Sequence, residues 1–158
     1  MTIPKTHYGA LQGFLEILDD IGSKSDLARV ALKQGLELDD LLPIVEAGEM
    51  FGLIQVQTGD VLLTEKGHLF MAASLKVRKK MLHDMVLNID AFKKFADYMK
   101  ESGSQSISRE DLLRFFSEGI AGLDATNDFA WFIEWGRQGL VLTYDANSEI
   151  VRLRKTKL

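Results

Sequence analysis

The residues that most often carry out catalysis or bind metals are few and scattered in this sequence. There is no cysteine, which excludes a thiol nucleophile, a zinc–thiolate site and a disulfide. His7, His68 and His83 do not follow a metal-ligand spacing such as HExxH. His83 precedes Asp84, but adjacent side chains on a helix do not face each other, so we interpret this pair as a solvated helix face. These patterns predict neither a metal site nor an enzyme.

Nucleotide chemistry is also not indicated. A phosphate-binding loop of the GxxxxGK[ST] type, which cradles phosphates with backbone N–H groups and a lysine, does not occur in the sequence. The acidic pairs Asp19–Asp20 and Asp39–Asp40 fall at the ends of expected helices, where carboxylates act as caps or as partners of the helix dipole. We therefore predict no catalytic residue, no cofactor and no nucleotide binding by this chain.

Length and charge limit the classes of protein that the sequence can encode. The chain has 158 residues and 46% hydrophobic residues, enough for one ordinary domain or two very small ones. It has no apolar run long enough to span a membrane and no signal peptide, so we expect a cytoplasmic protein. The net charge of −4 gives no sign of a large basic footprint. Two basic clusters, residues 76–80 and 152–157, are interpreted as a solvated helix face and a solvated tail; an acidic partner or a membrane-proximal surface is the alternative.

Hydrophobic periodicity predicts three helices and a β-hairpin in the first half of the chain. Helices are expected over residues 7–21, over residues 26–35 with Ser25 or Asp26 as the cap, and over residues 39–52 with Asp39 or Asp40 as the cap and Pro43 in the first turn. LIQVQ and DVLLT then form strands around Thr58-Gly59-Asp60. Thr64 is predicted to cap one long helix that continues to Leu87.

The second half repeats this plan. A helix begins near Asp90, a second begins at Ser108, and a third begins at Asp124 or Thr126. GLVLTYD and EIVRLRK form the second hairpin. The predicted fold is therefore a mostly helical α+β fold with two winged-helix-like units in tandem, each with three helices and a β-hairpin. Residues 1–87 form the first unit together with the long bridging helix, and residues 88–158 form the second.

The third helix of a winged helix usually enters the major groove of DNA, but here the corresponding segment is acidic. Residues 39–52 contain no lysine or arginine, and the outward face of the predicted helix carries Asp39, Leu42, Glu46, Glu49 and Met50. The equivalent helix of the second unit adds Asp124, Asp128 and Glu134 against a single cation, Arg137. Groove recognition needs cationic and amide side chains, so we predict that Leu42, Glu46, Glu49 and Met50 contact a protein and that no nucleic acid is bound.

The helix DFAWFIEWGRQ has more apolar surface than a small domain needs to bury. Phe129, Phe132 and Ile133 share one face, and Trp131 with Trp135 extends the apolar arc to about 200°. Either both indole rings lie in the core, or they form an i, i+4 pair that contacts a subunit or partner. We take Trp131 and Trp135 as further candidate contact residues.

Several segments together resemble a known family. DLARVALKQGLELDDLLPIVEAGEMFGLIQVQTGDVLLTEKG, VRKKML and IEWGRQGLVLTYD are similar to the C-terminal AAA-associated domain, and the resemblance extends roughly from Tyr8 to Leu153. The DDLLPIVEA helix, the GD turn, the LT-x-x-G exit and the WGR-x-x-L strand entry are specific only in combination. One departure is Gln138-Gly139 after WGR, where the resemblance leads us to expect an aromatic residue.

The resemblance implies an accessory role. Domains of this family follow the ATP-binding cassettes of nitrate, sulfonate and bicarbonate ABC transporters. A non-catalytic regulatory or interaction module is therefore expected, bound in cis or in trans to an ABC transporter ATPase at the inner face of the membrane, with homodimer formation as an additional expectation. The alternatives are a winged-helix transcription regulator that uses its basic tail and wing on DNA and, third, an incomplete ATPase subunit.

Overall fold

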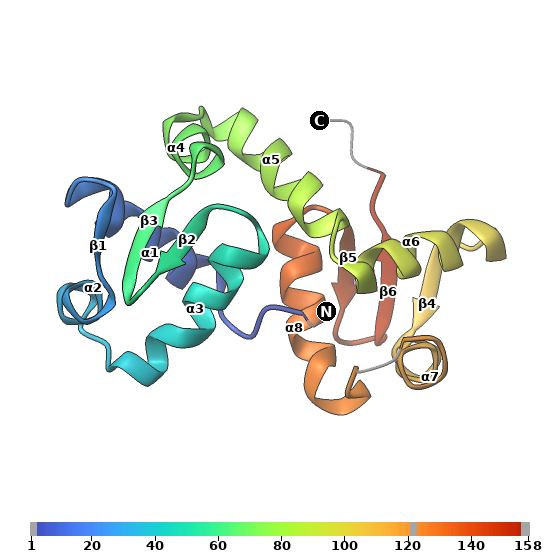
Figure 1. Ribbon diagram of the computed structural model, residues 1–158. Coiled ribbons are helices and arrows are strands. Elements are labelled where there is room, and N and C mark those ends of the chain that lie inside the picture. Colours follow the sequence, from blue (N-terminus) through green and yellow to red (C-terminus); the bar gives the residue numbers. More distant parts are fainter. Residues whose placement is uncertain (1–2, 121–122, 156–158) are drawn as a thin grey trace. The chain divides into compact units, whose positions relative to one another are not determined.

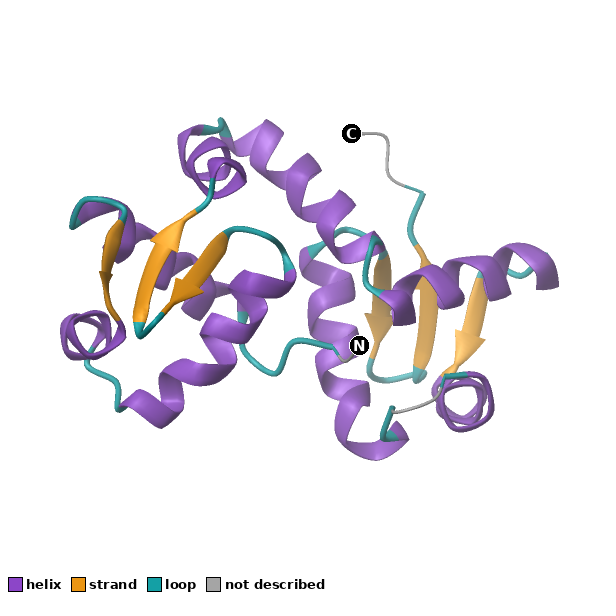
Figure 2. Cartoon of the chain, viewed as in Figure 1, coloured by secondary structure: helices purple, strands orange, loops and turns teal. Residues whose placement is uncertain are grey.

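Short strands are interspersed among helices in the described part of the chain, residues 3–120 and 123–155 of the computed structural model (Figures 1 and 2). The mostly helical α+β fold expected from the sequence is confirmed. The chain divides into an N-terminal unit, Pro4–Arg78, and a C-terminal unit of residues 79–155 that also includes Ile3. A division after residue 87 was predicted from the sequence, whereas the observed division falls inside a helix, between Arg78 and Lys79.

The N-terminal unit is built from helices packed around one small sheet. Its order is helix, strand, two helices, hairpin and a closing helix (Figure 1). The bounds are α1 (Tyr8–Asp20), β1 (Lys24–Asp26), α2 (Leu27–Gln34), α3 (Leu38–Met50), β2 (Ile54–Gln57), β3 (Asp60–Leu63) and α4 (Glu65–Ala72).

The C-terminal unit repeats that order after the helix in which the division falls. The bounds are α5 (Leu75–Leu87), α6 (Asp90–Ser102), β4 (Ser106–Ser108), α7 (Arg109–Gly119), α8 (Ala125–Gln138), β5 (Leu142–Asp145) and β6 (Ile150–Leu153). Antiparallel sheets of order β1-β3-β2 and β4-β6-β5 therefore occupy equivalent places in the two units (Figure 2).

The two units also share equivalent hydrogen bonds. Leu63 N donates to Ser23 O at 2.9 Å, and in the other unit Leu153 N donates to Gln105 O at 3.0 Å. The side chains of Asp26 and Ser108 both cap a helix by accepting from a backbone N–H three residues later, at 2.8 Å and 3.1 Å. These caps, like those of Thr64 and Asp124, were expected from the sequence.

The hairpin predicted in each unit is confirmed, but the third strand of each sheet was missed. β1 and β4 each add a third strand, pairing antiparallel with β3 and β6. Both strands are three residues long, and their polar residues are typical of a helix cap or a loop. They are strands because a hairpin strand beside them offers its free edge to their backbone, not because of local preference.

The predicted single helix from Thr64 to Leu87 was also wrong. It is divided into α4 and α5 at Ala73, whose backbone is extended with φ −69° and ψ 148°. Two local caps explain the break. The Ser74 hydroxyl accepts from Val77 N at 3.3 Å at the start of α5. Arg78 donates to Phe70 O and Met71 O, at 3.1 and 2.8 Å, so that the last carbonyls of α4 are satisfied.

Helix α3 begins earlier than expected. Glu37 is its N-terminal cap residue, whereas Asp39 and Asp40 lie in its first turn, where their carboxylates face the positive end of the helix dipole. Pro43 consequently lies in the second turn and not the first. Its missing N–H leaves the carbonyl of Asp39 without its usual helical donor.

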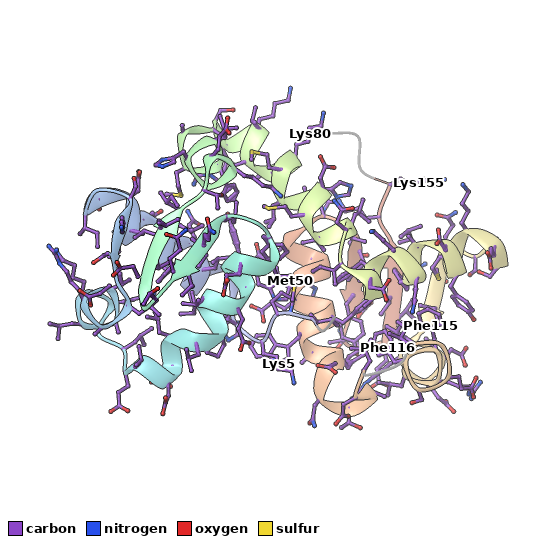
Figure 3. All side chains as sticks on the ribbon, viewed as in Figure 1. Lys5, Met50, Lys80, Phe115, Phe116 and Lys155 are labelled. Atoms are coloured by element: carbon purple, nitrogen blue, oxygen red, sulfur yellow. The ribbon has the colours of Figure 1, made fainter. Side chains whose placement is uncertain are left out.

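The core of the C-terminal unit is centred on Phe132 of α8. Its ring stacks on Phe92 of α6 with ring centroids 4.4 Å apart, and it meets Phe95 and Phe116 edge-on at 5.3 and 4.8 Å. Figure 3 labels Phe116 and its neighbour Phe115 on α7. Phe116 is fully buried, whereas Phe115 contacts the partly exposed Tyr98 at 4.7 Å. The aromatic cluster holds α6, α7 and α8 together.

Candidate functional site

The exposed side of α3 carries a regular stripe of apolar and acidic side chains. Leu38, Leu42, Glu46 and Glu49 follow one another at helical spacings of four, four and three residues, so they lie along one line of the helix surface. Leu38 is 49% exposed and Leu42 46% exposed, and both glutamates are exposed. We call these four residues the α3 stripe.

The opposite side of α3 fixes the stripe in place. Its buried residues are Leu41, Ile44, Val45, Ala47 and Gly48. A Cβ atom on Gly48 would lie 2.8 Å from the side chain of Ile54, which shows how closely α3 packs on the first residue of β2. Because this face is anchored, the stripe cannot turn inward without unfolding the unit.

The structure modifies the predicted contact residues of α3. Leu42, Glu46 and Glu49 are exposed as expected, whereas Met50 is only half-exposed at the C-terminal end of the helix (Figure 3). Leu38 was missed because the helix was expected to begin at Asp39. Its signal in the sequence is its position four residues before Leu42, which places both leucines on the same side of a helix that begins one residue earlier.

The repeat supplies an internal comparison for this face. Leu53 N donates to Gly48 O at 2.9 Å after α3, and Val141 N donates to Gly136 O at 2.8 Å after α8, so the two helices align through these glycines. With that alignment the positions of the stripe are occupied in α8 by Thr126, Ala130, Glu134 and Arg137. The exposed leucines therefore belong to the N-terminal unit alone, although both helices have the same buried face.

The single cation in this part of α8 is engaged in its own unit. Arg137 donates to Tyr144 O at 2.7 Å, and its guanidinium carbon lies 5.6 Å from the centroid of the Tyr144 ring. Arg137 thus ties α8 to β5. Asp128, expected on the outward face, is buried at 2% exposure and accepts from Asp124 N at 2.8 Å, so it belongs to the start of the helix. Its prediction as an outward acidic residue was wrong.

The two tryptophans of α8 differ in exposure. Trp135 is fully buried, which agrees with the core alternative and leaves its ring no surface to offer a partner. Trp131 is half-exposed and stays a predicted contact. The alignment with α3 agrees with this difference: Trp135 corresponds to Ala47, which is buried in α3, and Trp131 corresponds to Pro43, which is half-buried.

His83, expected on a solvated face, lies half-buried between two helices of the C-terminal unit. Its Nδ1 is 2.6 Å from Gly139 O at the C-terminal end of α8. Because a carbonyl only accepts, Nδ1 carries the proton and the ring ties α5 to α8. Among residues 3–120 and 123–155, no three side chains of the metal-ligating types are grouped closely enough to hold a metal ion.

A known protein family matches most of the chain. The family described as the C-terminal AAA-associated domain matches residues 28–145, from the first turn of α2 to the end of β5. The chain therefore belongs to the C-terminal AAA-associated domain family, whose name describes an accessory domain. No curated protein and no solved structure matched the chain. In the part of the chain that the structure describes, no helix is long and apolar enough to cross a membrane.

Proposed function

We propose that this chain is a non-catalytic regulatory module that binds the ATPase component of a nitrate/sulfonate/bicarbonate-type ABC importer, in cis or in trans, at the inner face of the membrane. The α3 stripe is the observation that carries the proposal. In a winged helix this is the surface that would face DNA, yet here it presents two leucines and acids. Membership in a family of AAA-associated domains supports an ATPase as the partner.

The chemistry of the stripe suits a protein surface that is both apolar and basic. Two leucine side chains that are about half-exposed can each contribute about 1 kcal/mol when a partner covers them. Glu46, Glu49 and the first-turn residues Asp39 and Asp40 surround them with negative charge. Such a rim speeds encounter with a positive surface and excludes acidic surfaces, so it adds specificity more than affinity.

The double variant Leu38→Thr, Leu42→Ala tests the proposal. It gives α3 the residues that α8 carries at the equivalent positions, so the N-terminal unit should keep its fold. We expect the affinity for an importer ATPase from the same genome to fall by about tenfold to a hundredfold, since two apolar contacts of about 1 kcal/mol each are removed. Fluorescence anisotropy of the labelled chain titrated with the ATPase measures this loss, and circular dichroism checks the fold.

A matched control makes the same two substitutions at exposed leucines elsewhere. Leu69 and Leu75, which are 61% and 70% exposed on α4 and α5, are replaced by threonine and alanine. The control should bind the ATPase like the wild type. If both double variants bind equally well, or if the wild type does not bind the ATPase at all, the proposed role of α3 is wrong.

The alternative function, a winged-helix DNA-binding regulator, has one observation in its favour. Arg152, Arg154 and Lys155 are exposed on β6 and just after it, where a winged helix would place its wing. The acidic α3 stripe argues against this function, because groove recognition needs positive and amide side chains. We expect no duplex binding whose affinity falls steeply with added salt. An anisotropy titration with mixed-sequence duplexes at low salt checks this, and tight salt-sensitive binding abolished by Arg152→Glu, Arg154→Glu would establish the regulator instead.

A further inference from the structure

A second exposed surface, with the opposite charge to the α3 stripe, lies on α4 and the first turns of α5. Leu69, Leu75 and Val77 are 61%, 70% and 51% exposed. The same two helices carry four exposed lysines, namely Lys66, Lys76, Lys79 and Lys80. We call these seven residues the α4–α5 patch; Figure 3 shows Lys80 extending from α5 away from the ribbon.

The patch is free of acidic residues in a chain that is otherwise acidic. No aspartate or glutamate occurs from residue 66 to residue 83, although the whole chain has a net charge of −4. Glu65 lies before this stretch and Asp84 after it. Along α5, Leu75 and Lys79 are four residues apart, as are Lys76 and Lys80, so the apolar and cationic side chains form one broad exposed face.

Arg78 is a different kind of residue from these lysines. Its guanidinium donates to Phe70 O and Met71 O and lies over the Phe70 ring, 5.3 Å from the centroid. It therefore sets the angle between α4 and α5 and is itself not available as a docking cation. Burial raises the pKa of the nearby Tyr8 hydroxyl, and the positive charge of Arg78 opposes that shift. The patch is thus a preformed corner of the fold.

We propose that the α4–α5 patch binds the surface of an anionic lipid bilayer. This inference goes beyond the proposed ATPase contact and does not depend on it. Protein interfaces favour arginine and aromatic residues and are depleted in lysine, whereas here the free cations are all lysines and the apolar residues are aliphatic. Lysines that surround aliphatic side chains are typical of surfaces that rest on anionic lipid, with the apolar tips in the interface and the ammonium groups among the headgroups.

The charge distribution also orients the N-terminal unit. Figure 1 shows α4 and the N-terminal end of α3, where Leu38 and Leu42 lie, at opposite ends of this unit. An anionic surface attracts the lysines of the patch and repels the acids of the α3 stripe. An N-terminal unit that rests on lipid through α4 and the first turn of α5 therefore turns α3 away from the bilayer, where a protein partner can reach it.

Vesicle flotation of the full chain tests the inference. The wild type should bind vesicles that contain phosphatidylglycerol, bind pure phosphatidylcholine weakly, and lose the first interaction as salt is added. The triple variant Lys76→Gln, Lys79→Gln, Lys80→Gln should lose about a hundredfold in affinity, since each lysine near an anionic surface contributes roughly fivefold. The double variant Leu75→Ala, Val77→Ala should weaken vesicle binding at high salt as well, because the contribution of these two apolar side chains is not electrostatic.

Helix α6 provides the matched control. Lys93→Gln, Lys94→Gln, Lys100→Gln removes the same charge from exposed helical positions, but these lysines alternate with Asp90, Asp97 and Glu101. This variant should bind vesicles like the wild type. The inference is overturned if the wild type does not bind anionic vesicles, or if both triple variants lose affinity equally. It is also overturned if the α5 triple variant loses binding to a DNA duplex or an acidic protein but still binds vesicles. None of these outcomes depends on whether an ATPase binds α3.

Discussion

Replacing Trp135 by alanine is expected to lower the free energy of unfolding by about 3–5 kcal/mol. The indole ring is fully buried in α8, and removing it leaves a cavity that the surrounding side chains fill only in part. Its helix neighbour one turn before, Trp131, is half-exposed. Because small domains are stable by about 5–15 kcal/mol, the loss at Trp135 is a large fraction of the total.

Chemical denaturation followed by far-ultraviolet circular dichroism measures this effect. Fluorescence is unsuitable, since Trp131 and Trp135 are the two tryptophans of the chain and each variant removes one of them. The same substitution at Trp131 is the control, and it should cost much less and leave the variant folded. A Trp135→Ala protein as stable as the Trp131→Ala protein would show that α8 is rotated relative to the packing described above.

The comparison of the two tryptophans illustrates what a helical wheel can and cannot determine. The wheel of α8 gave an apolar arc of about 200°, wider than any single buried face, so it could not separate core from surface. The structural repeat removes the ambiguity. Once Gly48 and Gly136 are aligned, Trp135 takes the place of Ala47, which is buried in α3.

The parts of the fold that were predictable depend on local chemistry. The caps at Thr64 and Ser108 were predicted correctly, and Asp26 and Asp124 were each one of two predicted candidates, because each of these side chains satisfies a backbone N–H two or three residues away. The hairpin turn was correct for a similar reason. Gly59 has φ 84° in a two-residue turn, a conformation that glycine adopts without steric cost.

The features that were missed depend on distant partners or on competition between caps. β1 and β4 have no alternating pattern and become strands only beside β3 and β6. The break at Ala73 was missed because the apolar pattern continues across it. The hydrogen bonds of Ser74 and Arg78 make two shorter helices more stable than one long helix. Leu38 was missed because acids at Asp39 and Asp40 resemble a cap but serve the helix dipole.

The largest effect expected in the N-terminal unit comes from a single methyl group. Gly67 lies in the first turn of α4, where its N–H donates to the Thr64 hydroxyl at 3.0 Å. A Cβ atom at this position would collide with the backbone carbonyl oxygen of Leu53 and lie 3.1 Å from a methyl carbon of Leu63. Leu53 O also accepts from Thr64 N at 3.0 Å, so the carbonyl cannot move without breaking that bond.

Gly67→Ala should therefore lower the free energy of unfolding by about 3 kcal/mol, because relief of the collision requires α4 to move away from the junction of α3 and β2. Gly9→Ala is the matched control. Gly9 is exposed in the first turn of α1, and a Cβ atom there meets nothing within 4 Å. With no collision, the higher helix propensity of alanine should stabilise the protein by about 0.5–1 kcal/mol. The two substitutions thus shift the denaturation midpoint in opposite directions, and a stabilised Gly67→Ala protein would mean that α4 does not pack on Leu53.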